Sequence, residues 1–337
     1  MTRSIHTNGD IKKEGYLYHS YGDQKYLRHV VASVSTLRRY DSHRPVTLAA
    51  DTNQLDQLRE TGLDKLFDQL VPLPENHQSI TGFKHNLHHY APYSRTLFLD
   101  SDIIWCKSPD SLWASFSPYP FTITGLEVSD NFFGSSKHIG VVFDIFLQRR
   151  KRTLKRFGLT HLSRVQSGMI YAADTKLTRQ VCERAAELYR HKKETHFHSR
   201  LRETGRSEES CEWSMAMAMA QYNLSVYPWF QGDYSPQLDF IDSYTTFDES
   251  FKKVRCLYYG NPFVYSFRGL KQKWLRVILI RLFGLLPGKG DYRLVTPYTL
   301  HFGWIHQKKT FYQFADREWE RLKRRREPER AEMSLRE

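Results

Sequence analysis

The feature of the sequence that most constrains the fold is a short apolar run, Leu97-Phe98-Leu99, followed at once by Asp100 and Asp102. The run is continuous rather than alternating, which indicates a strand buried on both faces, as in a parallel sheet covered by helices. Burial of a strand does not explain carboxylates at its end. Because open α/β sheets bind ligands at the carboxyl ends of their strands, we expect the two aspartates to face a ligand.

The spacing of the two aspartates lets both carboxylates reach one hard divalent cation. Such cations prefer carboxylate oxygens and often share them with the phosphates of a substrate. This Asp-x-Asp is the only one in the chain. An ordinary surface turn is the alternative, because aspartate is common in turns. We predict a site for a metal ion and a nucleotide diphosphate centred on Asp100 and Asp102.

The segments around this run alternate between strand and helix patterns. Strands are expected at 15–20, 45–50, 66–72, 96–99, 119–124, 165–172 and 298–303. Helices are expected at 25–40, 53–62, 83–90, 177–190, 212–221 and 311–337. Such alternation predicts an α/β fold with a mostly parallel sheet flanked by helices, here with a helical basic C-terminal extension. Gly168 inside an expected strand indicates a bulge or a close backbone approach.

The size and charge of the chain set further limits. Its 337 residues suit one large α/β domain or two modest ones, and 40% hydrophobic residues are typical of a folded globular protein. We expect a flexible tail at 1–14, one domain at 15–310 and a basic helical tail at 311–337. The formal charge of +13 indicates a polyanionic neighbour, which could be a phosphate-bearing substrate, anionic lipid or nucleic acid.

The cysteines and the termini bear on location. None of the four cysteines has zinc-ligand spacing, which favours reduced thiols in a cytosolic chain, with two disulfides as the alternative. The N-terminus lacks the apolar core of a secretory signal, and no stretch has the roughly 20 apolar residues of a membrane helix. We therefore expect a cytoplasmic protein.

Three basic segments allow peripheral contact with an anionic membrane at its cytoplasmic face. They are 149–156, 271–281 and the arginine-rich C-terminal segment 323–326. The apolar run 274–286 is too short and too interrupted by arginine to span a bilayer, but it could lie at the interface. A buried helix fits that run better, because its basic residues do not gather on one face.

Three motifs, in this order, resemble the GT-A glycosyltransferases, especially the glycogenin-like and lipopolysaccharide galactosyltransferase-like enzymes of family 8. Thr96–Ile103 is similar to the family's Asp-x-Asp strand, and Gln166–Ile170 is similar to its Asn-Ser-Gly-x-Met strand. His301–Gly303 with Lys308 resembles its His-x-x-Gly-x-x-Lys-Pro-Trp. Here the glycine is one residue closer and the Pro-Trp is missing. The likeness covers 15–310 at the level of motif order.

The resemblance implies a GT-A (Rossmann-like) enzyme that moves a hexose from a nucleotide-diphosphate sugar, by default a UDP-sugar, with retention of configuration. The acceptor hydroxyl would belong to a carbohydrate, a lipid-linked molecule or a protein. Asp100, Asp102 and His301 would bind Mn²⁺ or Mg²⁺, which acts as a Lewis acid on the departing diphosphate. His306 is a rival to His301, and a core histidine at a strand end is a further alternative.

The resemblance also implies further site residues. Those expected to bind the donor are Ser20, Tyr21, Lys84, Ser101, Ser167, Gly168, Gly303 and Lys308. Tyr21 could stack on the base, and the lysines would neutralise phosphate. Gln166 and Glu212 are expected beside the transferred sugar with catalytic roles, although exposed helix glutamates are common and a surface position is the alternative for Glu212.

Two other functions remain open. A sugar nucleotidyltransferase should carry a glycine-rich phosphate loop with Lys or Arg after the first strand, and Tyr21-Gly22-Asp23 is not such a loop. A non-enzymatic basic protein would bind nucleic acid or membrane with a steep salt dependence. Because no known nucleic-acid motif is present, we expect no nucleic-acid partner.

Overall fold

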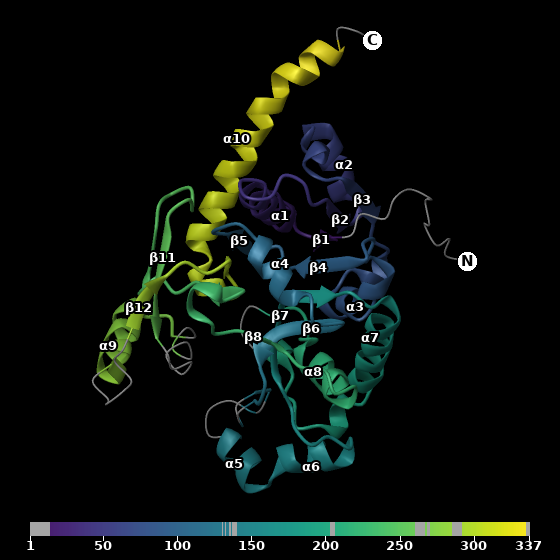
Figure 1. The fold of residues 1–337 in the computed structure, drawn as a ribbon, viewed down its shortest axis with the longest axis vertical. Coiled ribbons are helices and arrows are strands. Elements are labelled where there is room, and N and C mark those ends of the chain that lie inside the picture. The colour runs from purple at the N-terminus through teal and green to yellow at the C-terminus, as the bar shows by residue number, and fades with distance from the viewer. Residues whose placement is uncertain are drawn as a thin grey trace.

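The computed structural model describes residues 14–129, 131, 133–134, 136, 140–202, 206–259, 267, 270–284 and 292–334. Residues 1–13 of the expected flexible tail, residues 285–286 of the apolar run and residues 335–337 of the expected C-terminal helix lie outside these ranges. Figure 1 shows a central sheet with helices on both faces. At one side lie β11 (Val254–Tyr259), β12 (Tyr292–Val295) and α9 (Lys273–Gly284), and at one end lie α5 (Gly140–Phe146) and α6 (Arg149–Arg156).

The central sheet has seven strands in the order β3-β2-β1-β4-β7-β6-β8 within the described residues. Only β7 runs antiparallel to its neighbours, so the predicted α/β fold with a mostly parallel sheet is confirmed. Its strands are β1 (Glu14–Ser20), β2 (Val46–Ala50), β3 (Gln69–Pro72), β4 (Arg95–Leu99), β6 (Phe121–Leu126), β7 (Arg164–Ala172) and β8 (Tyr227–Pro228).

Alternate residues of the central strands enter two separate cores. In β4, Leu97 and Leu99 pack on one face, while Phe98 packs on the other, and all three are buried. The Leu97 face is covered by α1 (Gln24–Leu37), α2 (Thr52–Thr61), α4 (Asp110–Phe116) and α10 (Lys309–Ser334). The Phe98 face is covered by α3 (Ile80–Lys84), α7 (Thr175–Arg190) and α8 (Glu212–Gln221). The continuous apolar run therefore reflects burial on both faces.

Aspartate side chains begin three of the helices. Asp23, Asp51 and Asp174 accept hydrogen bonds from backbone amides in the first turns of α1, α2 and α7. These bonds satisfy amides that have no partner inside the helix. Helix α2 ends at Gly62, whose φ of +70° suits glycine.

Two small sheets complete the fold, and most of their strands are too short to be read from the sequence. One contains β5 (Ile103–Trp105), β13 (Thr299–His301) and β9 (Gln237–Asp239) in the order β5-β13-β9. The other contains β10 (Thr245–Phe247), β11 (Val254–Tyr259) and β12 (Tyr292–Val295). The β5 sheet matters for function because β5 follows Asp102 directly.

Some helices differ from expectation. The helix expected at 83–90 is replaced by α3 and a separate 3₁₀ turn at Leu87–His89. Two further helices are α5 (Gly140–Phe146) and α6 (Arg149–Arg156). Helix α9 (Lys273–Gly284) covers most of the apolar run 274–286, but it is not the buried helix expected there, because Trp274, Ile278 and Leu282 are exposed. Other 3₁₀ turns within the described residues are Leu63–Leu66, Glu75–His77, Lys192–Glu194, Arg200–Arg202, Gly232–Tyr234 and Ile305–Gln307.

The C-terminal helix α10 packs along α1 over its first half (Figure 1). Phe311, Phe314 and Trp319 are buried, and Arg28 of α1 pairs with Asp316 at 2.8 Å. The helix continues beyond Pro328 to Ser334.

All four cysteines are free and buried, as the reduced-thiol prediction requires. Within the described residues, no helix combines the length and apolarity needed to cross a bilayer.

Candidate metal and donor site

The Asp100-Ser101-Asp102 segment is the turn by which the chain leaves the central sheet and enters the β5 sheet. Asp100 follows β4, and its backbone amide donates to the carbonyl of Gly168 in β7 at 2.9 Å. Asp102 precedes β5, and its carbonyl accepts from the amide of Phe302 at 3.0 Å. Both ends of the turn are therefore held by backbone bonds to other strands.

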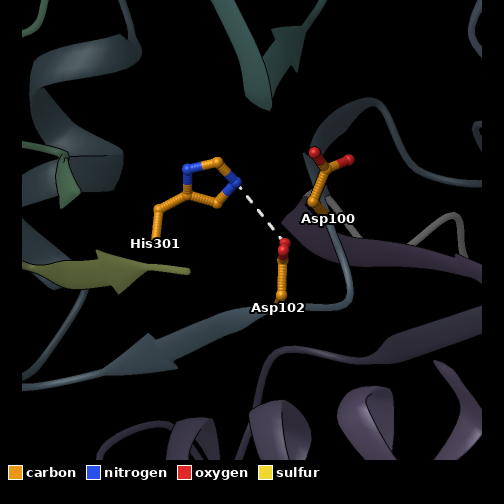
Figure 2. A group of neighbouring side chains, drawn as sticks. All are labelled: Asp100, Asp102 and His301. Carbon is orange, nitrogen blue, oxygen red and sulfur yellow. Dashed lines mark ion pairs between the residues drawn. The ribbon is translucent and has the colours of Figure 1, made fainter. Parts of the chain in front are cut away.

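Strand pairing brings His301 to this turn. In the β5 sheet His301 lies opposite Ile103 on one side and opposite Asp239 on the other. Its Nε2 is 3.4 Å from Asp102 Oδ1, and Figure 2 shows His301, Asp100 and Asp102 converging. One ligand atom from each of the three residues lies within 4.8 Å of the others. The three residues expected to bind a metal are thus neighbours in space.

The donor set fits a divalent metal ion. Two carboxylates and an imidazole suit Mn²⁺ and related ions, and Mg²⁺ favours the carboxylates. On its other side, His301 Nδ1 lies 3.1 Å from Asp239 Oδ1. With the Nδ1 proton donated to this carboxylate, Nε2 is the nitrogen that faces Asp102. A carboxylate behind a histidine ligand in this way fixes the ring and its tautomer.

Each aspartate of the turn is also paired with its own lysine. Lys84 Nζ lies 2.7 Å from Asp100, and Lys308 Nζ lies 2.7 Å from Asp102. Lys84 additionally donates to the carbonyl and hydroxyl of Ser167 at 2.8 and 3.0 Å. Because both lysines are largely buried, their charges are screened little by water.

Electrostatics hold the charged groups of this cluster ionised despite burial. Burial opposes the charged form of His301, but Asp102 and Asp239 raise its pKa to about 10. Burial likewise opposes ionisation of Asp102, yet Lys308 and His301 hold its pKa well below the usual range. The pKa of Lys308 is raised by Asp102. A bound cation would therefore replace positive charge that the protein itself supplies in this structure.

Gly168 leaves room beside the imidazole. Ile123 of β6 pairs with Ile170 of β7, and Gly125 pairs with Val165. Between these two pairs β7 contains more residues than β6, so β7 bulges around Gly168. A Cβ added at Gly168 would lie 3.3 Å from His301 Nε2. The expected bulge is therefore present, and it keeps the space before the candidate metal ligand open.

Gln166 lies in the same bulge, and its side chain contacts His301. Its side-chain amide is 2.5 Å from His301 Nδ1. Gln237, on β9 of the small sheet, donates to the Gln166 side chain and, at 2.8 Å, to the hydroxyl of Thr124. Gln166 thus belongs to a buried polar network behind His301, and its catalytic role stays a prediction.

Glu212 stands on the other side of the bulge, at the first residue of α8. Its carboxylate accepts from the Ser167 amide and the Ser210 hydroxyl at 3.4 Å each, and Arg200 lies 3.5 Å away. These contacts are long for hydrogen bonds. Glu212 is only partly exposed and lines the cavity, so the alternative of an ordinary surface glutamate does not describe it.

The expected base-binding residues are Ser20, the last residue of β1, and Tyr21, which follows it. The Tyr21 hydroxyl donates to Glu208 at 2.9 Å, and Glu208 also accepts from the Ile80 amide at 2.6 Å. The Tyr21 ring stacks on that of His19, with centroids 5.9 Å apart. Ser20 is buried, and its hydroxyl has no hydrogen-bond partner within the described chain.

One cavity of about 590 Å³ unites these residues. Its walls include all of the residues expected for metal, donor and catalysis: Ser20, Tyr21, Lys84, Asp100, Ser101, Asp102, Gln166, Ser167, Gly168, Glu212, His301, Gly303 and Lys308. His306, the rival ligand, is not in this lining, although Ile305 is. The individual roles of these residues stay predictions.

The structure adds site residues that sequence reasoning missed. They include Asp239 behind His301, Glu208 beside Tyr21, and the arginines Arg164, Arg200 and Arg206 in the cavity wall. A signal existed for Asp239, because a charged residue interrupts the apolar stretch Leu238–Ile241. Glu208 lies in a polar stretch where nothing distinguishes it from a solvated residue.

Comparisons with known proteins give similarity only at the level of solved structures. No family model matches the chain, and no curated protein matches its sequence. The chain is similar to the galactosyltransferase LgtC in complex with donor and acceptor sugar analogues (TM-score 0.47, 9% identity, covering 91% of this chain and 94% of that one). It is similar to the glycosyltransferase GlyE of Streptococcus pneumoniae (TM-score 0.47, 11% identity, 94% and 63%) and to mouse xyloside xylosyltransferase 1 (TM-score 0.42, 12% identity, 67% and 87%). The functional assignment rests on the site itself.

Proposed function

We propose that this protein is a metal-dependent glycosyltransferase that moves a hexose from a nucleotide-diphosphate sugar, by default a UDP-sugar, to an acceptor hydroxyl. The observation that carries the proposal is the convergence of Asp100, Asp102 and His301 on one point in the wall of the large cavity. A histidine that one carboxylate orients and that lies beside two further carboxylates provides ligands suited to a metal ion. Burying these charged groups merely to fill a core would be unfavourable.

The surroundings support a diphosphate as the group that meets the metal. Asp100, Asp102 and His301 would hold Mn²⁺ or Mg²⁺, and the bound cation would stabilise negative charge on the departing diphosphate. Lys84 pairs with Asp100 and Lys308 pairs with Asp102, and both lysine side chains are largely buried. Both lysines would attract the phosphates once a bound cation neutralises the aspartates.

The residues on the far side of the bulge favour a sugar as the group that is transferred. Gly168 permits close approach, and Ser167 and Gln166 offer hydrogen-bonding groups beside it. Glu212 presents a weakly bonded carboxylate there, which suits stabilisation of positive charge at the anomeric carbon or orientation of the acceptor hydroxyl. Retention of configuration, as the family-8 resemblance implies, is part of the proposal.

The test is thermal unfolding of the full chain with a panel of nucleotide-sugars, with and without Mn²⁺. Binding to the folded state raises the melting temperature, so one nucleotide-sugar should stabilise the protein only when Mn²⁺ is present. Release of free nucleotide diphosphate from that compound, stopped by chelator, would complete the evidence. Full activity in excess chelator would rule out the metal role. Formation of the nucleotide-sugar from a nucleoside triphosphate and a sugar phosphate would show a nucleotidyltransferase instead.

A further inference from the structure

The short helix α5 exposes a cluster of apolar side chains directly beside the short basic helix α6. They lie together at one end of the molecule, at the bottom of Figure 1. Large apolar side chains that α5 and the residue after it expose to solvent are Val142, Phe143, Ile145, Phe146 and Leu147. Phe146 is 83% exposed, which is unusual for a phenylalanine in a folded domain.

The charges of this tip, defined as residues 140–156, are almost all positive. Helix α6 reads Arg-Arg-Lys-Arg-Thr-Leu-Lys-Arg. Asp144, the single acidic residue of 140–156, is 4% exposed, pairs with Arg149 at 3.1 Å and accepts from the Ser136 amide at 2.9 Å. The tip therefore turns its one carboxylate inward and shows cations to solvent.

Not all of these cations are available to a partner. Arg149 pairs with Asp144, Arg150 donates to the carbonyl and hydroxyl of Ser129, and Arg156 pairs with Glu194. Lys151, Arg152 and Lys155 are exposed and form no ion pair within the described part of the chain. Three unpaired cations thus stand next to five exposed apolar side chains.

We propose that this tip docks on an anionic lipid bilayer, with the α5 side chains inserted at the level of the headgroups and Lys151, Arg152 and Lys155 on the lipid phosphates. Charge complementarity favours this occupant, because a surface of anionic headgroups above acyl chains matches cations beside apolar groups. Lysine and arginine stems also extend along apolar surface while their charges reach phosphate. The proposal does not depend on the reaction catalysed.

The experiment is sedimentation of the full chain with vesicles of phosphatidylcholine alone and of phosphatidylcholine mixed with phosphatidylglycerol. Wild-type protein should bind the anionic vesicles at least about tenfold more tightly, and added salt should weaken that binding. Replacing Phe143, Ile145 and Phe146 by serine should lower binding by about tenfold or more. Replacing Lys151, Arg152 and Lys155 by glutamine should abolish the preference for anionic vesicles.

A matched control comes from α9, which also exposes an apolar stripe: Trp274, Ile278 and Leu282. Serine at these three positions removes similar apolar area elsewhere on the molecule and should leave vesicle binding unchanged. Loss of binding in the α9 variant alone would overturn the assignment to the tip. Equal binding to both vesicle types, or none to either, would overturn the bilayer as partner. Unchanged melting temperatures of all variants would exclude unfolding as the cause.

Discussion

The cavity and the tip are both rich in lysine and arginine, but they use these residues in opposite ways. At the Asp100–Asp102 turn each buried lysine is 2.7 Å from its own carboxylate, and His301 lies between Asp102 and one further carboxylate, Asp239. At the tip the single carboxylate is buried and three exposed cations have no partner within the described chain. The net charge of +13 therefore includes two kinds of basic residue, which need separate explanations.

The difference teaches what each kind of positive charge can bind. Buried and paired cations are fixed in place, so they recognise a small anion of defined geometry, such as a diphosphate. Exposed and mobile cations attract an extended anionic surface without selecting among its groups. A variant that alters one region should therefore leave the function of the other intact.

The largest effect is expected from Asp102→Asn. Asp102 contacts both His301 and Lys308, so losing its charge removes a proposed metal ligand and the counter-charge of a buried lysine together. Release of nucleotide diphosphate should fall by about a thousandfold or more. Asp56→Asn, at an exposed position on α2, is the matched control and should be fully active.

The same variant tests the separation of the two regions. Asp102→Asn should sediment with anionic vesicles as wild-type protein does, because the tip is unchanged. A parallel loss of vesicle binding would show that the Asp100–Asp102 turn and the tip do not act independently.

A smaller effect is expected from Asp239→Asn. The asparagine still fits beside His301 Nδ1 but no longer carries the charge that holds the ring as a ligand. Loss of such a supporting group typically lowers metal affinity about 10- to 100-fold. Titration of Mn²⁺ followed by thermal unfolding would measure it. Unchanged Mn²⁺ affinity would mean that His301 does not bind the metal through Nε2.

Gly168→Ala should cost less still. The new methyl group would lie 3.3 Å from His301 Nε2 and 3.1 Å from the side-chain oxygens of Gln166 and Gln237, close enough to require small shifts. We expect about a tenfold loss of donor affinity in the presence of Mn²⁺. The melting temperature without ligand should fall only slightly, because the atoms nearest to the new methyl group belong to side chains, which can shift more easily than backbone. A large drop would indicate a structural role for the glycine.

How far the sequence could predict the site depends on whether each signal is local. Asp100 and Asp102 were predictable because an apolar strand that ends in two charges is anomalous over a few residues. Gly168 was predictable because glycine interrupts a strand pattern. In both cases the anomaly lies within one element, and the fold class followed from the same alternation of strands and helices.

Residues whose role depends on distant pairing were not predictable. Asp239 lies on a three-residue strand, and its place behind His301 follows only from the parallel pairing of β9 with β13. Glu208 meets Tyr21 across a sequence separation of 187 residues. The surface of the tip was hidden for the opposite reason: α5 is apolar, so its sequence favours burial, and only packing shows that its side chains are left outside.

The smallest effect is expected from Tyr21→Phe, which keeps the ring and removes the hydroxyl bonded to Glu208. If Tyr21 stacks on the base, the ring matters more than the hydroxyl, and one lost hydrogen bond should raise the donor KM by about two- to fivefold without changing kcat. Tyr21→Ala should raise KM further because the stacking surface is gone. Steady-state kinetics of both variants would decide the point, since equal effects would mean that Tyr21 acts only by anchoring Glu208.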